Sequence, residues 1–351
     1  MTEWLETTLD KLVKLQRGHD LPASQREAGS VPVMGAAGQS GTHDTAIVKA
    51  PGVVLGRAGA SMGKATYCDV DFWPLNTSLY VTDFLGNEPR FVYYLLSLID
   101  FSGYNSGAAQ PMLNRNYIKQ IKIFLPRPQE QKAIAEVAGA LDEKIAVNER
   151  IAAAATSLGE ALFRRTAQSG DGSKVLGDLI DLKYGKSLPA SRREQGRVPV
   201  FGSGGVSGSH NASLVSGPGV IVGRKGTVGA VYWSQRDFFP IDTTFYVSLN
   251  SPDFSMEYAY FALRELGLEH MNSDSAVPGL NRANALAQKV KAPSPREVRN
   301  FTDRAHRLFQ LKHQHEEENI SLAALRDTLL PQLMSGKLRV RDAEKIVEDA
   351  V

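Results

Sequence analysis

LPASQREAGSVPV at Leu21–Val33 returns as LPASRREQGRVPV at Leu188–Val200, and the two stretches are identical at 10 of 13 positions. The similarity continues through residues 31–59 and 198–226, which agree at 15 of 29 positions. Each copy lies 167 residues from its counterpart, a period too long for a solenoid of short repeats. The chain is therefore a duplication of one large unit.

Length and composition are those of an ordinary globular protein with about two domains. The 351 residues are 42% hydrophobic and 22% charged, and no apolar run of 18 residues or charged-then-apolar leader occurs. We therefore expect neither a membrane span nor secretion. The one cysteine, Cys68, excludes an intramolecular disulfide and a cysteine-cluster metal site, and favours a buried thiol in a cytoplasmic protein. The net charge of +2 argues against a protein that coats nucleic acid, but permits positive charge placed locally.

Each half begins with about 120 residues that are rich in glycine, proline and short apolar runs. GVVLGR, SLYVTD, GVIVGR and TFYVSL predict short strands joined by turns, and FVYYLLSLI and MEYAYFALREL predict helices. This pattern is typical of a compact α/β (α+β) domain with many loops.

A long helix follows each of these domains. Residues 129–165 lack proline and are full of strong helix formers, and Pro128 precedes them as a start signal. The counterpart over residues 296–330 follows Pro295 and is expected to end at Pro331. At the rise of an α-helix, some 36 residues make a rod of about 55 Å.

Matched apolar positions at spacings of three, four and seven form one stripe on each helix, which predicts packing against a partner helix. If the helices pack on each other in antiparallel orientation, a pseudo-twofold axis relates the halves and the domains lie at opposite ends of the rod. Asn148 and His315 interrupt the stripe; they either set the register or face solvent. The residues expected to pack between the helices are Ile134, Ala138, Leu141, Leu158, Leu162, Phe301, Ala305, Leu308, Leu325 and Leu329.

Enzyme signatures are missing from the sequence. No phosphate-binding loop, HExxH, GxSxG or metal-ligand spacing occurs, so we expect no catalytic and no metal-ligating residue. His43 and His210 recur within GxSGxH, but Asp44 beside the first becomes Asn211 beside the second. A general base with a fixed carboxylate partner is therefore disfavoured, and each histidine either contacts a ligand or ties down its loop.

Basic side chains are concentrated in the loop-rich domains, and several arginines recur at matched positions. Such groups bind phosphates and base edges, whereas the alternative is an ordinary solvated surface. We take recurrence to favour binding. The candidate DNA-binding residues are Gln39, Ser40, His43, Arg57, Lys64, Arg115, Ser207, His210, Arg224, Lys225 and Arg282.

As a set, these motifs resemble the specificity subunit of type I restriction-modification systems along essentially the whole chain. The resemblance lies in VPVMGAAGQSGTH and VPVFGSGGVSGSH, PGVVLGRAG and PGVIVGRKG, WPLNT and FPIDT, and PRPQEQKAI and PSPREVRNF. It implies two target-recognition domains, over residues 1–128 and 169–295. Helical spacers are then expected over residues 129–168 and 296–340, followed by a tail over 341–351.

The family resemblance also implies a function without chemistry in this chain. Each recognition domain would read one half of a split double-stranded DNA target, and the antiparallel coiled-coil helices would fix the gap between the half-sites. The helices would also dock modification subunits, expected to be two, which carry S-adenosylmethionine and methylate adenine. Restriction and translocase subunits with ATP and Mg would complete the complex. No cofactor and no membrane contact is expected for this chain.

The two recognition domains are unusually alike for that family. Either they read related half-sites, or the shared motifs are scaffold and the reading residues lie in unmatched segments such as 83–108 and 249–275, which we favour because shared glycines and prolines serve backbone geometry. Three rival functions stay open. They are a specificity subunit for a fused endonuclease-methyltransferase, a stand-alone enzyme with a duplicated domain, and a structural protein built on its rods.

Overall fold

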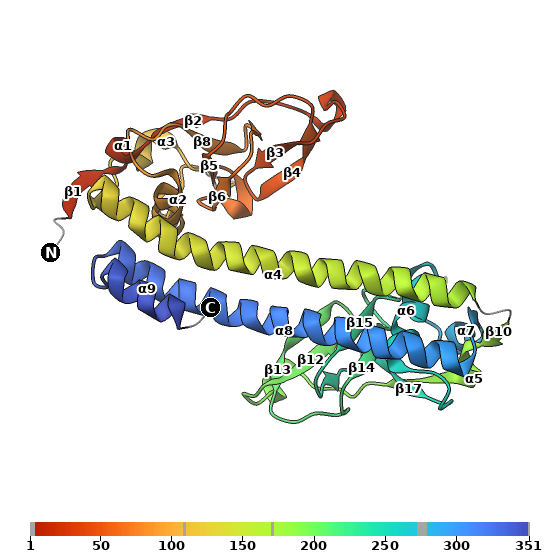
Figure 1. Ribbon diagram of the computed structural model, residues 1–351. Helices are drawn as coiled ribbons and strands as arrows, with labels where there is room; N and C mark the ends of the chain where they lie inside the picture. Colours follow the sequence, from red (N-terminus) through yellow and green to blue (C-terminus); the bar gives the residue numbers. More distant parts are fainter. Residues whose placement is uncertain (1–3, 108–109, 170–171, 272–278, 350–351) are drawn as a thin grey trace. The chain divides into compact units, whose positions relative to one another are not determined.

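The protein is described by a computed structural model that covers residues 4–107, 110–169, 172–271 and 279–349. It divides into two compact units: unit 1 is Met1–Ala146 with Asn319–Val351, and unit 2 is Val147–Glu318. Two long helices, α4 (Pro128–Gln168) and α8 (Pro295–Met334), each contribute to both units (Figure 1). Within the described residues no helix is both long and apolar enough to cross a lipid bilayer.

Unit 1 contains a 4-stranded sheet of order β2-β8-β5-β6, a 3-stranded sheet β4-β3-β7 and a 2-stranded sheet β1-β9. Its strand pairs are antiparallel except for the parallel pair β3–β7. The elements are β1 (Leu5–Thr8), α1 (Leu9–Leu12), β2 (Lys14–Arg17), η1 (Ala23–Gln25), β3 (Val31–Gly35), β4 (Gly38–His43), β5 (Gly52–Gly56), η2 (Gly59–Ser61), β6 (Ala65–Cys68), β7 (Trp73–Pro74), β8 (Ser78–Asp83), α2 (Pro89–Leu98), η3 (Ser102–Tyr104), α3 (Arg115–Ile118), β9 (Lys122–Leu125) and, near the C-terminus, α9 (Val340–Glu348).

Unit 2 repeats this topology strand for strand, with sheets β11-β17-β14-β15, β13-β12-β16 and β10-β18. The parallel pair is again the matched one, β12–β16. The elements are β10 (Ser173–Val175), α5 (Leu176–Leu179), β11 (Ile180–Tyr184), η4 (Ala190–Arg192), β12 (Val198–Gly202), β13 (Gly205–His210), β14 (Gly219–Gly223), β15 (Val231–Ser234), β16 (Phe239–Pro240), β17 (Thr244–Leu249), α6 (Met256–Glu265), η5 (Leu268–His270), α7 (Arg282–Leu286) and β18 (Lys289–Lys291).

The most buried strands are the apolar runs that the sequence marks in both halves. Every residue of β5 (GVVLG) and of β14 (GVIVG) is buried, and each of these strands lies between two others in its sheet. Burying one valine or leucine side chain contributes about 1.5–3 kcal/mol. These two strands therefore anchor the cores around which the loops are arranged.

Helices α4 and α8 run antiparallel in each unit. In unit 1, Arg326 donates to Asp142 over 2.6 Å and Asn319 donates to the carbonyl oxygen of Ile145 over 3.3 Å. As the residue number rises on one helix it falls on the other. In unit 2, Asn148 donates to Glu318 over 3.0 Å, which continues the same register.

Most of the side chains expected between the helices are buried. Six have exposed fractions of 5% or less, and Leu162, Leu308 and Leu325 are half-buried. Leu158 was predicted wrongly, because its side chain is 52% exposed. Gly159 and Phe163 are buried instead, so the packed stripe on this part of α4 lies one position further along. The six buried residues are Ile134, Ala138, Leu141, Phe301, Ala305 and Leu329.

The polar interruption of the stripe does not face solvent. Asn148 is fully buried, and its amide donates to Glu318, whose carboxylate also lies 3.3 Å from Nδ1 of His315. The prediction that these polar residues face solvent is therefore wrong for Asn148, which makes a buried polar contact between the helices. Such a contact favours a register that keeps its partners together.

The ends of the helices differ in part from the predicted spacer boundaries. Helix α8 begins with a capping box, in which Glu297 accepts from the backbone N–H of Ser294 over 2.9 Å. The helix continues through Pro331, because a proline near the end removes few hydrogen bonds and Leu333 beyond it is buried. It ends at Met334, short of residue 340, and the expected tail contains helix α9.

In unit 1 a polar cluster joins the sheet-covering helix to the long helices. Helix α2 lies between the main sheet and α4 (Figure 1), and the hydroxyl of Tyr94 donates to Asp142 over 2.6 Å. Arg326 on α8 donates to the other oxygen of the same carboxylate. Burial raises the pKa of Tyr94, so its phenol is a hydrogen donor at neutral pH.

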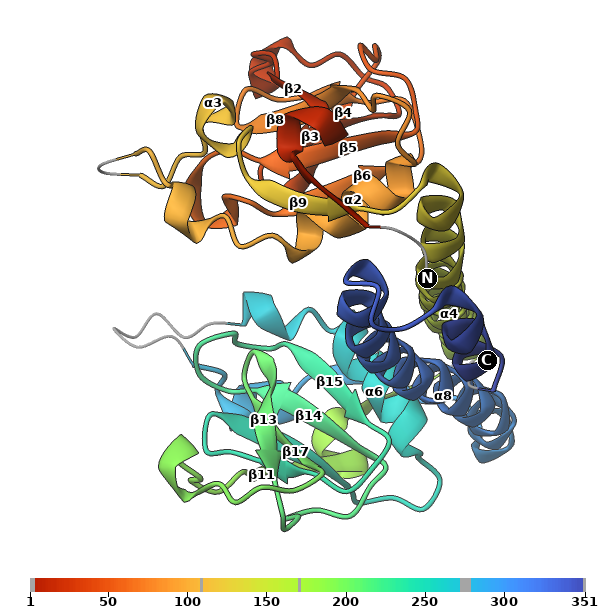
Figure 2. The ribbon, with the colours of Figure 1, turned by 90° about the vertical axis from the view of Figure 1, so that its left-hand side faces the viewer.

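The three matched positions in unit 2 form an aromatic junction instead. Helix α6 lies beside α8 (Figure 2), and Phe261, Phe309 and Gly159 stand where unit 1 has Tyr94, Asp142 and Arg326. The rings of Phe261 and Phe309 stack with centroids 5.6 Å apart. A Cβ atom on Gly159 would lie 2.7 Å from the Phe261 ring, so this ring leaves no room for a larger side chain at position 159. The three residues therefore differ between the two units as a set.

We expect Gly159→Ala to destabilise the protein by about 1–3 kcal/mol, because the added methyl group would displace the Phe261 ring. Gly139→Ala is the matched control on the same helix, since its Cβ would meet only the flexible side chain of Arg90. Alanine there should be neutral or stabilise by up to about 1 kcal/mol. Urea denaturation measures both, and equal midpoints for the two variants would contradict this junction.

Candidate nucleic-acid interface

Each recurrent histidine fastens a loop to the hairpin on which it lies. Nδ1 of His43 accepts from the backbone N–H of Glu27 over 3.0 Å, and Nδ1 of His210 accepts from Glu194 over the same distance. His43 is buried and His210 is half-buried. Of the roles expected for these histidines, the geometry favours tying down the loop.

A second brace on the same hairpin comes from an arginine that the list of candidates lacks. Arg26 donates to the carbonyl oxygen of Ser40 over 2.7 Å, and Arg193 donates to that of Ser207 over 2.6 Å. Gly41, with φ +136°, lies against the Arg26 guanidinium, where a Cβ would approach within 2.6 Å. The sequence indicates this arginine only by its recurrence, since Arg26 and Arg193 occupy the same position of the duplicated stretch.

The candidate polar residues of the hairpins are also engaged. Ser40 and Ser207 donate through their hydroxyls to the carbonyls of Val33 and Val200, over 3.3 and 3.2 Å. Gln39 is exposed and donates to a carbonyl two residues away. A hydroxyl oxygen keeps acceptor capacity after donating, so these contacts leave room for water or a ligand.

The recurrent arginines after the central strands also bind the backbone. Arg57 donates to the carbonyl of Asn76 over 3.2 Å, and Arg224 donates to the matched carbonyl of Asp242 over 2.6 Å. Each is half-buried. A guanidinium carries five N–H groups, so each arginine is fixed in place with donors to spare.

Arg115 and Arg282 repeat the arrangement on the neighbouring strand. Arg115 donates to the carbonyl of Leu15 over 3.4 Å and Arg282 to the matched carbonyl of Leu182 over 2.7 Å, and Arg282 also pairs with Asp181. All three recurrent arginine pairs thus hold matched carbonyl groups. Recurrence reflects scaffold at these positions, whether or not the same side chains also meet DNA.

The two candidate lysines differ. Lys64 donates to the carbonyl of Ala37 at the turn of the hairpin β3–β4 over 3.0 Å. Lys225 is exposed, and its ammonium makes no hydrogen bond or ion pair within the described part of unit 2. The structure therefore brings Lys64 to the hairpin, while Lys225 is left to solvent.

The unmatched segments each contain a partly buried helix and exposed loops. Within residues 83–108, α2 buries Phe91, Val92 and Leu96, and within residues 249–275, α6 buries Tyr258 and Phe261. Residues 108 and 272–275 lie outside the described residues. The helices in these segments fasten each sheet to the long helices, while the loops beside them are exposed, so the favoured location of the reading residues stays a prediction.

In the described residues, no group of three or more His, Cys, Asp or Glu side chains is placed to hold a metal ion. Cys68 is buried, and desolvation raises the pKa of its thiol to about 12. It is therefore a protonated core residue at neutral pH.

The comparisons with known proteins agree with the sequence resemblance. The family model for the type I restriction modification DNA specificity domain matches residues 1–156. No curated protein matches the chain. The crystal structure of a type I restriction-modification system S subunit from M. genitalium is similar, with 21% sequence identity and a TM-score of 0.70 over 95% of this chain and 96% of that one.

Two further solved structures match with lower TM-scores. One is described as the structural basis of complex assembly and conformational transition of the type I R-M system, with a TM-score of 0.43, 14% identity, and 95% of this chain and 98% of that one covered. The other is the HsdS subunit from Thermoanaerobacter tengcongensis, with a TM-score of 0.33, 14% identity and coverage of 95% and 97%.

The fold class predicted from the sequence is confirmed, with sheet-rich α/β domains joined to long helices like those of an S subunit. The second half repeats both the sequence motifs and the strand order of the first. The family model for the type I restriction modification DNA specificity domain thus matches residues 1–156, in agreement with the resemblance seen in the sequence.

Proposed function

We propose that this chain is the DNA-recognition subunit of a type I restriction-modification complex and reads a two-part target, one half-site with each α/β domain. The observation that carries the proposal is the duplication of a complete fold, with the same strand order and the same parallel pair in both units. Two copies of one reading domain on a single chain suit a target with two separated parts. Half-sites about one duplex turn apart, or about 34 Å, are within reach of domains on helices of about 60 Å.

The α4–α8 pair serves, in this proposal, as both spacer and docking site. The polar contact around Asn148 favours one register, which suits a fixed spacing. Chemistry is left to the partners: modification subunits carrying S-adenosylmethionine, expected to be two, and restriction and translocase subunits using ATP and Mg. The chain itself would bind no cofactor and act in the cytoplasm, where the DNA lies. A specificity subunit for a fused endonuclease-methyltransferase is not favoured by the family match.

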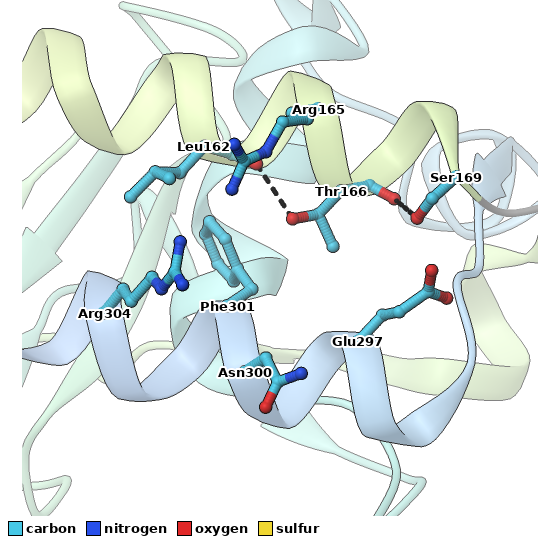
Figure 3. A pocket seen from close by; sticks show the side chains of 8 residues that line it. All are labelled: Leu162, Arg165, Thr166, Ser169, Glu297, Asn300, Phe301 and Arg304. Carbon is cyan, nitrogen blue, oxygen red and sulfur yellow. Dashed lines mark hydrogen bonds between the residues drawn. The ribbon is translucent and has the colours of Figure 1, made fainter.

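A pocket of about 270 Å³ between the helices of unit 2 suggests where a partner docks. Arg165 on α4 and Arg304 on α8 line it from opposite sides (Figure 3). Leu162, Phe301 and Glu297 also line the pocket. Neither guanidinium makes an ion pair or hydrogen bond within the described residues. Two unpaired cations beside an apolar floor suit a carboxylate-bearing, partly apolar segment of a modification subunit.

The target itself tests the proposed function. The chain expressed with its modification subunit should methylate adenine at a motif of two short specific parts separated by unspecified bases. Sequencing of methylated DNA measures this. A single uninterrupted motif, or no methylation when the chain is present, would overturn the proposal.

Lys225→Gln should weaken DNA binding by a similar factor on all sequences, because an exposed lysine whose ammonium has no partner among the described residues suits a phosphate contact. Losing one phosphate contact lowers the slope of log K against log salt by about 0.9. Lys312→Gln is the control, since this lysine pairs with Glu316 on α8. A slope equal to that of the unaltered protein would remove Lys225 from the interface.

The double variant Arg165→Glu with Arg304→Glu should lower affinity for the modification subunit at least tenfold, because it replaces two free cations with anions. Arg299→Glu, on the same helix and outside the pocket, should bind almost normally. Titration of the full-length chain with the modification subunit measures both. Equal affinities would place the docking surface elsewhere.

A further inference from the structure

The two domains differ beside their matched arginines, at the ends of β2 and β11. Arg17 on β2 pairs across the strands with Leu79 on β8, whereas the matched Tyr184 on β11 pairs with Phe245 on β17. The arginine beside each pair stays the same and is fixed by the backbone. A constant arginine thus has a charged neighbour in unit 1 and an aromatic neighbour in unit 2.

In unit 1 the outcome is two neighbouring cations. Arg17 is exposed, and neither it nor Arg57 has a carboxylate partner within the described residues. Burial, followed by the nearby charge of Arg17, lowers the pKa of Arg57. Two like charges without an anion are unfavourable in the free protein, so a ligand rich in acceptors would relieve the repulsion.

In unit 2 the same place presents an aromatic surface. Tyr184 is 57% exposed and meets Phe245 edge to face, with centroids 4.9 Å apart. The Arg224 guanidinium lies over the Tyr184 ring at 5.3 Å from its centroid, held there by the carbonyl of Asp242. An exposed ring braced from two sides presents a rigid apolar contact beside the Arg224 guanidinium.

We infer that positions 17 and 184 determine which bases the two domains read, an inference that rests on the proposed function. Arg17 with Arg57 presents two guanidinium groups, which suit the O6 and N7 acceptors of guanine in the major groove. Tyr184 with Arg224 presents an apolar ring, which suits the methyl group of thymine. The half-sites therefore differ although the folds match.

The test exchanges the two residues in the full-length chain assembled with its modification subunit. A pool of duplexes with randomised sequence is the probe, and the bound fraction is sequenced. Arg17→Tyr should weaken the preference for guanine in one half-site and leave the other unchanged. Tyr184→Arg should add a guanine preference in the other half-site only.

Two further variants keep the result interpretable. Arg17→Gln removes the guanidinium without adding bulk and should lower affinity for the preferred sequence at least about fivefold, the loss expected for one bidentate base contact. Gln16→Tyr adds the same ring at the adjacent exposed position, which points to the other face of the strand, and should leave the motif unchanged.

The possible failures are distinct. If the unaltered complex selects no two-part motif, the proposed function fails and the inference fails with it. If it selects such a motif and the exchange variants select the same one, only the inference is overturned. A loss of affinity that is uniform over all sequences would also overturn it, because it would identify Arg17 as a phosphate contact.

Discussion

The antiparallel pairing of α4 with α8 is the constraint on which the rest of the structure depends, because each half of the sequence completes the core of the other. In unit 1 the buried cluster contains Leu329 and Leu333 from α8 beside Leu9 and Ile134. In unit 2 it contains Phe163 from α4 beside Phe301. A duplicated domain with one amphipathic helix has an apolar stripe left over, and pairing buries both stripes at once. Each core is therefore complete only when both long helices are folded and paired.

Around that pairing, the duplicated domains are held by contacts that do not depend on neighbouring side chains. Arg26, Arg57 and Arg115 donate to backbone carbonyls, and their counterparts donate to the matched carbonyls. A carbonyl group survives any substitution of its residue, so such a brace tolerates change around it. Side chains that contact each other have instead changed as sets, as at the polar and aromatic junctions on α4 and α8.

Much of this fold could be predicted from the sequence, because each apolar pattern can be checked against its copy in the other half. The strands, the long helices and most of the packed stripe followed from matched apolar positions. The prediction for Leu158 was wrong because apolar spacings of three and four do not fix which of two adjacent rows of a helix is buried. The packing of the Phe163 ring against Phe261 decides this in the folded protein. Helix α9 was missed because it has no counterpart in the first half, so the repeat gave no second reading of it.

The candidate site shows where repetition misleads. Recurrence predicts binding residues, but the structure places the shared arginines and histidines on backbone groups that hold the loops. A sequence comparison cannot separate an arginine that braces a carbonyl from one that meets a base, because both need the same residue at the same place. Exposed positions beside a fixed arginine, such as Arg17 and Tyr184, carry the opposite signal, since the scaffold does not require either residue. Under the proposed function, such positions can vary and change the bases that are read without disturbing the core.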